Sequence, residues 1–363
     1  MTSQETEARA PVSMQVHRNG QSNVSSNAVS IHHNAALLSV VEVTAPLEVT
    51  SQMLDERLEA VLERLRLPQR LLERVAGVKV RRMWEGPEDY MHGAAQAGVK
   101  ALAEAGVSPD AVGLLINTSV TRSQLEPAVS VQIHDAMGLA PSATNFDITN
   151  ACLGFVNGMD LAATLIDAGQ IDYAVVVAGE DAKNVQEATL QNLLSERTTR
   201  DNFMEQFASL TLGSGAAAAV LGRADLHPEG HKILRGVTRA GTQHHGLCQG
   251  GHDGMYTDSG ALLENGLELV MDAWNDTPAE WNWRGMDRYI THQVSQMHTD
   301  AIIESAGIDR AKIPTTFPHL GNIGPAALPI TLARELDSLK VGDRVLALGV
   351  GSGLNVAMLE IEW

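Results

Sequence analysis

The sequence predicts an α/β protein whose sheets are covered by helices on both faces. Runs such as residues 112–117, 173–178 and 345–350 are almost wholly apolar, as expected of strands buried on both faces. Segments with helical signals alternate with these runs along the chain. The 363 residues are 44% hydrophobic but only 4% aromatic, so small and aliphatic side chains must build the core.

The first half of the chain alternates expected strands and helices, each justified by a local signal. Thr50 and Ser51 are N-cap residues before an amphipathic segment, Pro87 opens a helix, and Gly106 ends it. Strands are expected where short apolar runs lie between turn signals, at residues 35–43, 77–82, 112–117, 144–148 and 173–178. Helices are expected at residues 51–67, 68–75, 87–106, 127–137 and 152–169.

The second half repeats this alternation. Strands are expected at residues 216–221, 233–238 and 288–290, and residues 345–350 and 356–361 form a closing hairpin. Helices are expected at residues 262–274, 294–307 and 325–339. The segments 171–180 and 342–351 are weakly alike, each with a charged turn, a buried strand and a Gly-rich turn. This likeness indicates an internal duplication.

The polar N-terminal segment sets the expected organisation. Residues 1–27 are rich in Ser, Gln, Asn, Glu and Thr without an apolar period, so they are interpreted as a disordered tail. We expect an N-terminal half over residues 28–215 and a C-terminal half over residues 216–363.

Charge and cysteine content exclude several classes of partner. The net charge of −18 argues against nucleic acid and anionic membranes, which need a basic face. The two cysteines are too few for a disulfide scaffold, which favours a cytoplasmic protein. No apolar run reaches the length of a membrane span, and no secretory signal is visible.

Common cofactor and metal motifs are missing from the sequence. There is no phosphate-binding GxxxxGK[ST] loop, no GxGxxG and no HExxH, and we expect no cofactor and no metal. His244, His245, Cys248 and His252 have zinc-ligand chemistry, but nine residues leave little chain to wrap an ion. A polar surface loop is the favoured interpretation of this run.

The most informative segment surrounds Cys152. A buried strand enters the turn Asn150-Ala151-Cys152, which places the cysteine at the first turn of the next helix. A helix N-terminus favours thiolate over thiol, and its N–H groups can bind an oxyanion on an acyl group. A small buried structural cysteine is an equal alternative on these residues alone.

Two further segments carry candidate catalytic side chains. His292 directly follows an expected strand, where catalytic groups of buried sheets tend to emerge. Asn322 lies in the Gly-rich turn Gly321–Ala326 before a helix. Taken singly, His292 is more often an ordinary core or surface residue, and Asn322 a turn or cap residue.

Together these motifs resemble the thiolase superfamily, specifically its β-ketoacyl-ACP synthase III branch. The resemblance extends from about Ala28 to Trp363 and rests on the DITNACLGF, HQ, GNIGPA and GVGSGLN segments. It implies a thiolase fold of five αβαβα layers, built from two similar halves with mixed sheets. It also implies a homodimer with Cys152 as nucleophile and His292 and Asn322 as its catalytic partners.

The segment LLINTSVTRSQLEP, residues 114–127, resembles more narrowly the OleA-type acyl-CoA:acyl-CoA alkyltransferases of bacterial olefin biosynthesis. In that family the Glu before the Pro reaches into the partner subunit's active site, which implies the same role in trans for Glu126. Without the resemblance, Glu126 is simply an acid at a helix N-terminus.

The resemblance also implies roles for three further residues, for which the sequence motifs are less specific. The backbone N–H of Ser352 would complete the oxyanion hole with that of Cys152; otherwise Ser352 is only part of a hairpin turn. Arg81 and Arg82 lie where family members receive the CoA nucleotide, and a solvated or ion-paired surface strand is the alternative for both.

The implied activity is a non-decarboxylative Claisen condensation of two fatty acyl-CoAs. Its product is a 2-alkyl-3-oxo acid precursor of long-chain olefins, with downstream olefin-pathway enzymes as possible partners. A decarboxylative β-ketoacyl-ACP synthase III with a malonyl donor is the alternative, and it needs no carboxylate base. A non-catalytic thiolase-fold subunit is a third interpretation, against which the joint presence of Cys152, His292, Asn322 and Glu126 argues. A hydroxymethylglutaryl-CoA synthase ranks low.

Overall fold

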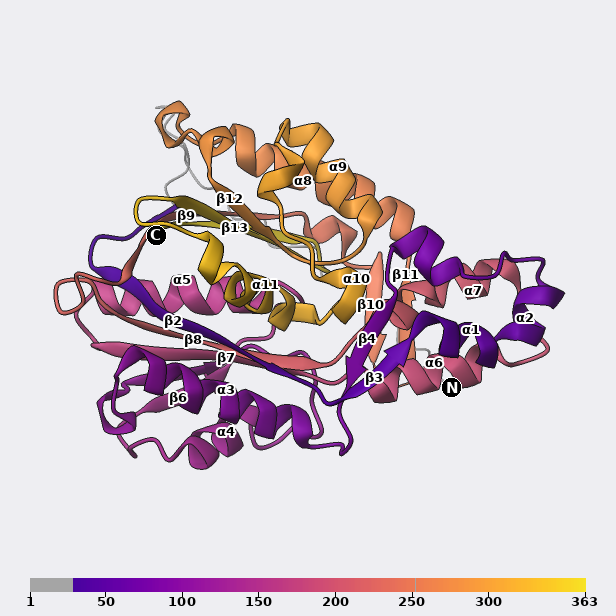
Figure 1. Ribbon diagram of the computed structural model, residues 1–363, viewed down its shortest axis with the longest axis horizontal. Coiled ribbons are helices and arrows are strands. Elements are labelled where there is room, and N and C mark those ends of the chain that lie inside the picture. The colour runs from indigo at the N-terminus through magenta and orange to yellow at the C-terminus, as the bar shows by residue number, and fades with distance from the viewer. Residues whose placement is uncertain (1–28, 252) are drawn as a thin grey trace, which may run out of the picture.

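Two mixed β-sheets, separated by helices and covered by helices on their outer faces, form the body of the protein (Figure 1). The computed structural model describes residues 29–251 and 253–363; the tail expected at residues 1–27 therefore lies outside the described residues. The first sheet has the order β6 (Thr144–Asp147), β5 (Leu114–Asn117), β7 (Tyr173–Glu180), β8 (Gly215–Arg223) and β2 (Ala35–Thr44). The second has the order β12 (Arg288–Thr291), β13 (Arg344–Gly351), β14 (Asn355–Glu362), β9 (His231–Ala240) and β1 (Val29–Ile31).

The two sheets repeat the same strand directions. In the first, β5 runs parallel to β7, and β8 and β2 follow antiparallel. In the second, β12 runs parallel to β13, and β14 and β9 follow antiparallel. β7 and β13 therefore occupy equivalent places, in agreement with the duplication that their sequences indicate. The two sheets are joined into one hydrogen-bonded set of ten strands where Ala36 and Leu37 of β2 pair with β9.

The expected boundary between the two halves of the protein, at residues 215 and 216, lies too early in the chain. β8 begins at Gly215 and pairs with both β7 and β2, so it belongs to the first sheet. The chain enters the second sheet only at β9, which starts at His231. The apolar run of β8 has the composition of a buried strand in either sheet, and only its hydrogen-bonded partners decide between them.

Three layers of helices complete the five-layer αβαβα arrangement (Figure 1). α3 (Asp89–Ala105) and α4 (Val129–Met137) cover the first sheet, and α8 (Ser259–Asn275) covers the second with α9 (Gln296–Ala306) beside it. α5 (Gly154–Asp167) and α11 (Ala327–Glu335) lie between the sheets and contact both. The predicted fold class is thus confirmed.

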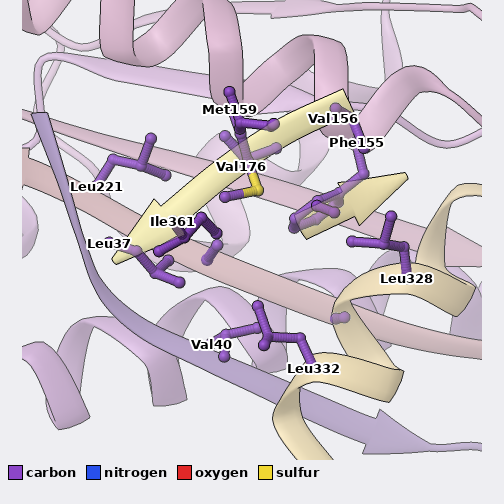
Figure 2. Close-up of a cluster of buried hydrophobic side chains, with 14 of the residues drawn as sticks. Leu37, Val40, Phe155, Val156, Met159, Val176, Leu221, Leu328, Leu332 and Ile361 are labelled. Atoms are coloured by element: carbon purple, nitrogen blue, oxygen red, sulfur yellow. The ribbon is translucent and has the colours of Figure 1, made fainter. Parts of the chain in front are cut away.

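The helix α5 is narrow because both of its faces are buried. A Cβ atom on Gly158 would lie 2.9 Å from a methyl group of Val176, so only glycine fits there. Figure 2 shows Phe155 and Met159 of α5 packed with side chains from both sheets and from α11. This packing fixes the position of the turn that precedes α5.

A side lobe of short helices extends from one end of the sheets (Figure 1). Its apolar core includes Leu58, Leu72, Leu193 and Phe203. The lobe and its two small two-stranded sheets comprise α1 (Ser51–Arg57), α2 (Glu59–Arg64), η2 (Leu72–Ala76), α6 (Lys183–Leu193), α7 (Arg200–Gln206), β3 (Leu47–Thr50), β4 (Val80–Met83), β10 (Cys248–Gly251) and β11 (Gly254–Thr257). α6, α7 and the β10–β11 hairpin were not predicted from the sequence.

The segment predicted as one helix over residues 51–67 is two, because the chain turns at Leu58. The helix expected from Pro68 is reduced to the single turn η2. Short helical turns elsewhere are α10 (Phe317–Leu320), η3 (Pro109–Ala111), η4 (Phe207–Thr211), η5 (Thr242–His244), η6 (Ala279–Trp281), η7 (Trp283–Gly285), η8 (Arg310–Lys312), η9 (Gly324–Ala326) and η10 (Leu336–Ser338). None of the helices in the described part of the chain is long and apolar enough to cross a membrane.

Candidate active site

The turn that carries Cys152 connects β6 to α5. The helix begins only at Gly154, so Cys152 precedes it by two residues rather than lying in its first turn. Ala151 has a φ of 45°, a left-handed conformation that costs energy for a residue with a Cβ atom and persists only where its surroundings hold it. The side chain of Asn150 supplies such a restraint, because it donates to Asn157 at 2.7 Å and accepts from Asn355 at 3.1 Å.

The ionisation of Cys152 differs from the expectation of a thiolate. Burial, with smaller contributions from the nearby Cys248 and Glu180, raises the pKa of the Cys152 thiol to about 12. The backbone N–H of Cys152 opposes this shift but is outweighed. Burial of the sulfur therefore outweighs the dipole of α5 and favours the neutral thiol form of Cys152.

His292 follows β12 and continues its pairing with β13. Its backbone N–H donates to the carbonyl oxygen of Leu348 at 2.9 Å, and its side chain is buried, with 7% exposure. Burial lowers the pKa of His292 to about 3, with a smaller effect of His298, so the imidazole is neutral at physiological pH. Among the described residues its Nδ1 atom has no hydrogen-bond partner.

Asn322 is held through its backbone and oriented through its side chain. Its N–H donates to Thr211 at 3.0 Å, and its carbonyl accepts from Gly213 at 2.9 Å. The side-chain Oδ1 accepts from the N–H of Gly324 at 3.0 Å. Because a backbone N–H can only donate, this contact identifies Oδ1 and leaves the Nδ2 group as a donor for another acceptor.

Cys152, His292 and Ser352 each lie just beyond the end of a sheet strand. Cys152 follows β6, His292 follows β12, and Ser352 lies in the turn between β13 and β14. A Cβ atom on Gly351 would lie 2.9 Å from the carbonyl oxygen of Asn150, so the Ser352 turn packs directly on the nucleophile's turn. Clefts at the carboxyl ends of parallel strands are the usual place for ligands in such sheets.

Glu180 is a site residue that the sequence analysis did not identify. It ends β7 with only 7% of its surface exposed, and its carboxyl carbon would lie 3.6 Å from a Cβ atom on Gly324. Burial raises the pKa of Glu180 to about 7, although hydrogen bonds from Thr121 and Val120 oppose the shift. The only signal in the sequence was a single acid at the end of an apolar strand.

Glu126 lies on a loop that projects from the chain, residues 123–128, here named the arch. Both Glu126 and its neighbour Leu125 are exposed, Leu125 to 92%. Within residues 29–251 and 253–363, no hydrogen bond or ion pair joins the Glu126 carboxylate to another group of its own chain. A single chain therefore does not pair Glu126 with the other candidate residues.

Arg81 does not lie where the resemblance placed it. Its side chain is fully buried beneath the side lobe, where Nη2 donates to Ser51 at 2.8 Å. Burial lowers the pKa of Arg81 to about 10. A side chain with no accessible surface cannot receive a CoA nucleotide, and the surface-strand alternative is equally wrong for Arg81. Arg82 is partly exposed and lies 3.5 Å from Glu48, an ion-paired position on the surface.

The histidine-rich run does not add a metal centre in the described part of the chain. No group of three or more His, Cys, Asp or Glu side chains there is arranged to hold an ion. His252, the last member of the run, lies outside the described residues.

A groove of about 710 Å³ opens beside the turn that carries Cys152. Asn150, Leu153, Arg239 and Asn355 are among the residues that line it.

Comparisons with known proteins place this architecture in a family. The protein-family model described as 3-oxoacyl-[acyl-carrier-protein] synthase III matches residues 146–241 of the sequence. The family model described as the C-terminal part of the same enzyme matches residues 277–363. The chain is 41% identical to an acyl-CoA:acyl-CoA alkyltransferase of Xanthomonas campestris, covering 92% of this chain and 100% of that protein. An enzyme with the same name from Shewanella oneidensis is 36% identical, covering 88% and 96%.

Solved structures agree with these matches. A crystal structure of an OleA variant from Xanthomonas campestris superposes with a TM-score of 0.89, at 41% identity, covering 92% of this chain and 99% of that one. Another, described with bound lauric acid and lauroyl-CoA, superposes with a TM-score of 0.88 and covers 92% and 100%. A β-ketoacyl-[acyl-carrier-protein] synthase III of Desulfitobacterium hafniense is only 26% identical, covering 79% and 87%. The chain belongs to the acyl-CoA:acyl-CoA alkyltransferase family, within the thiolase-fold condensing enzymes.

Proposed function

We propose that this protein joins two fatty acyl-CoAs by a non-decarboxylative Claisen condensation. The proposal rests on the joint presence of Cys152 after β6, His292 after β12 and Asn322 in the turn before α11, together with a carboxylate at position 126. A decarboxylative synthase obtains its carbanion by losing CO₂ and has no use for that carboxylate. The similarity to alkyltransferases over nearly the whole chain supports the same choice.

In the first half-reaction, Cys152 attacks the thioester of one acyl-CoA and releases CoA. The thiol is neutral in the resting enzyme, so it loses its proton as the sulfur attacks, and the departing CoA sulfur gains one, so that CoA leaves as a thiol. The oxyanion of the tetrahedral intermediate is bound by the N–H groups of Cys152 and Ser352. Packing of Gly351 against Asn150 supports this assignment, because it holds the two turns in contact.

In the second half-reaction, the α-carbon of another acyl-CoA becomes the nucleophile. Glu126 of the partner subunit removes an α-proton, and His292 and Asn322 hydrogen-bond the enolate oxygen. The neutral state of His292 and the free Nδ2 group of Asn322 suit this task, since both can donate to a developing oxyanion. The enolate then attacks the acyl group on Cys152, the bond between that carbonyl carbon and the Cys152 sulfur breaks, and a β-ketoacyl-CoA forms. Hydrolysis of its thioester by water then gives a 2-alkyl-3-oxo acid and free CoA.

The active enzyme in this proposal is a cytoplasmic homodimer. The arch projects away from its own chain with Leu125 almost fully exposed, which suits insertion into a second subunit. The product is a precursor for enzymes that make long-chain olefins. Arg82 remains a candidate contact for the CoA nucleotide.

The variant Glu126→Gln separates the two half-reactions. The amide keeps the size of the side chain but cannot accept a proton at neutral pH. With a long-chain acyl-CoA as the only substrate, the variant should form the acyl-enzyme, seen by mass spectrometry, at the normal rate. Condensation should fall by about 100-fold or more, the range for loss of a general base. Normal condensation by Glu126→Gln, or a requirement for malonyl-CoA, would instead establish the decarboxylative alternative.

A further inference from the structure

The arch that carries Glu126 has few contacts of its own: Ser123 hydrogen-bonds the Tyr90 hydroxyl, and Gln124 donates to the carbonyl oxygen of Pro127, while both ends of the arch are tightly held. Its tip, Leu125 and Glu126, is exposed to solvent. The chain enters the arch from β5 and leaves it into α4. The position of the Glu126 carboxylate is therefore set by the residues that anchor these two ends.

Glu180 anchors the entry to the arch. The N–H of Val120 donates to its Oε1 atom at 2.7 Å. Both the N–H and the hydroxyl of Thr121 donate to its Oε2 atom, at 3.1 and 2.6 Å. Three donors from two successive residues thus converge on one buried carboxylate, which is an arrangement of charge-assisted hydrogen bonds.

Asp147 anchors the arch on both sides. On the entry side its Oδ2 atom accepts from Arg122 at 2.6 Å. On the exit side its two oxygens accept from the N–H groups of Val129 and Ser130, at 3.0 and 2.9 Å. Because these N–H groups open α4, the helix dipole adds to the attraction. A single carboxylate thereby ties together the two ends of the arch.

We propose that Glu180 and Asp147 are positioning residues that present Glu126 to the partner subunit's active site. This inference rests on the proposed function, in which Glu126 is the base of the condensation. In this proposal, Glu180 and Asp147 act by fixing the place of the Glu126 carboxylate. A misplacement of about 1 Å in a catalytic group can slow a reaction by about 100-fold.

The variant Glu180→Gln tests the proposal. A glutamine presents an NH₂ group to at least one of the three donors, so the entry to the arch loosens while side-chain volume is kept. We expect acyl-enzyme formation at the normal rate and condensation about ten- to hundred-fold slower. Asp147→Asn, which disturbs both ends, should show the same split between half-reactions.

Heterodimers decide whether Glu180 acts through the arch or within its own site. Two affinity tags allow purification of dimers that pair a Glu180→Gln subunit with a Cys152→Ala subunit. The only working nucleophile then lies in the Glu180→Gln subunit and receives an intact arch from its partner. Condensation at about half the rate of the unmodified dimer is expected, since one of two symmetric sites is complete. Heterodimers as slow as the Glu180→Gln homodimer would overturn the proposal.

Controls separate this inference from the proposed function and from loss of stability. Glu335→Gln alters a partly buried glutamate at the end of α11, away from the arch. Its carboxylate accepts hydrogen bonds from Arg288 and Ser338. It should leave the ratio of the two half-reactions unchanged, whatever it does to the melting temperature. If Glu126→Gln condenses normally, the proposed function fails; if Glu126→Gln is impaired but Glu180→Gln and Asp147→Asn are not, only the positioning role fails.

Discussion

The pH dependence of Cys152 alkylation is a direct test of its buried environment. With a pKa of about 12, only about one thiol in 10⁵ is ionised at pH 7. An ordinary cysteine, with a pKa of about 8.5, is ionised to about 3% at that pH. Since the thiolate is the reacting form, Cys152 of the free enzyme should react with iodoacetamide about 10³-fold more slowly than an exposed cysteine.

The sign of the effect follows from the raised pKa. Raising the pH increases the thiolate population, so the alkylation rate should rise about tenfold per pH unit from pH 7 to pH 9.5 without levelling off. The neutral His292, whose pKa is lowered to about 3, supplies no positive charge that would flatten this rise. Peptide mass spectrometry follows the modification, and Cys152→Ala identifies the signal that belongs to Cys248.

A plateau in the alkylation rate between pH 6 and pH 8 would refute this reasoning. It would mean that Cys152 is already a thiolate, as a helix N-terminus alone would predict. Acylation by substrate would then begin from a charged nucleophile, and the arriving thioester would not have to trigger loss of a proton.

Three further outcomes are expected. Cys152→Ala should fold normally and release no CoA from an acyl-CoA; release at the ordinary rate would remove Cys152 as nucleophile. Gly351→Ala should slow both half-reactions, because its Cβ atom would lie 2.9 Å from the carbonyl oxygen of Asn150 and displace the Ser352 turn; unchanged CoA release would contradict the oxyanion assignment. Glu360→Gln should lower the free energy of unfolding by about 3–5 kcal/mol, measured by urea denaturation, because its buried carboxylate pairs with both Arg235 and Arg344. A loss below about 1 kcal/mol would show that the two guanidinium groups are solvated rather than dependent on Glu360.

The sequence was sufficient for the main strands and for the order of the catalytic candidates. Continuous apolar runs identify β5, β7 and β13, because a strand covered on both faces must be apolar at every position. Cys152 and His292 were singled out because each follows a predicted strand, and Asn322 because it lies in a Gly-rich turn before a helix. The local sequence is enough to recognise these strands and motifs, because neither depends on contacts between residues that are distant in the chain.

The tertiary structure decided the properties that depend on residues distant in sequence. Arg81 is followed by a second arginine in a short strand, a pattern of surface strands, yet the side lobe buries it completely. The helix start favoured a thiolate at Cys152, but the packing around it raises the pKa instead. Glu180 is an ordinary acid in sequence, and its function as an anchor depends on donors some 60 residues earlier.

Burial and hydrogen bonding are sums over neighbours that the fold brings together from different elements. A local pattern records which side chains are apolar and where the chain turns. It does not record how deeply a charged group is covered, or which donors converge on it. For this protein, the sequence alone was enough to select Cys152, His292, Asn322 and Glu126 as catalytic candidates. The tertiary packing decided the protonation of Cys152 and His292, the burial of Arg81 and the anchoring of the arch by Glu180.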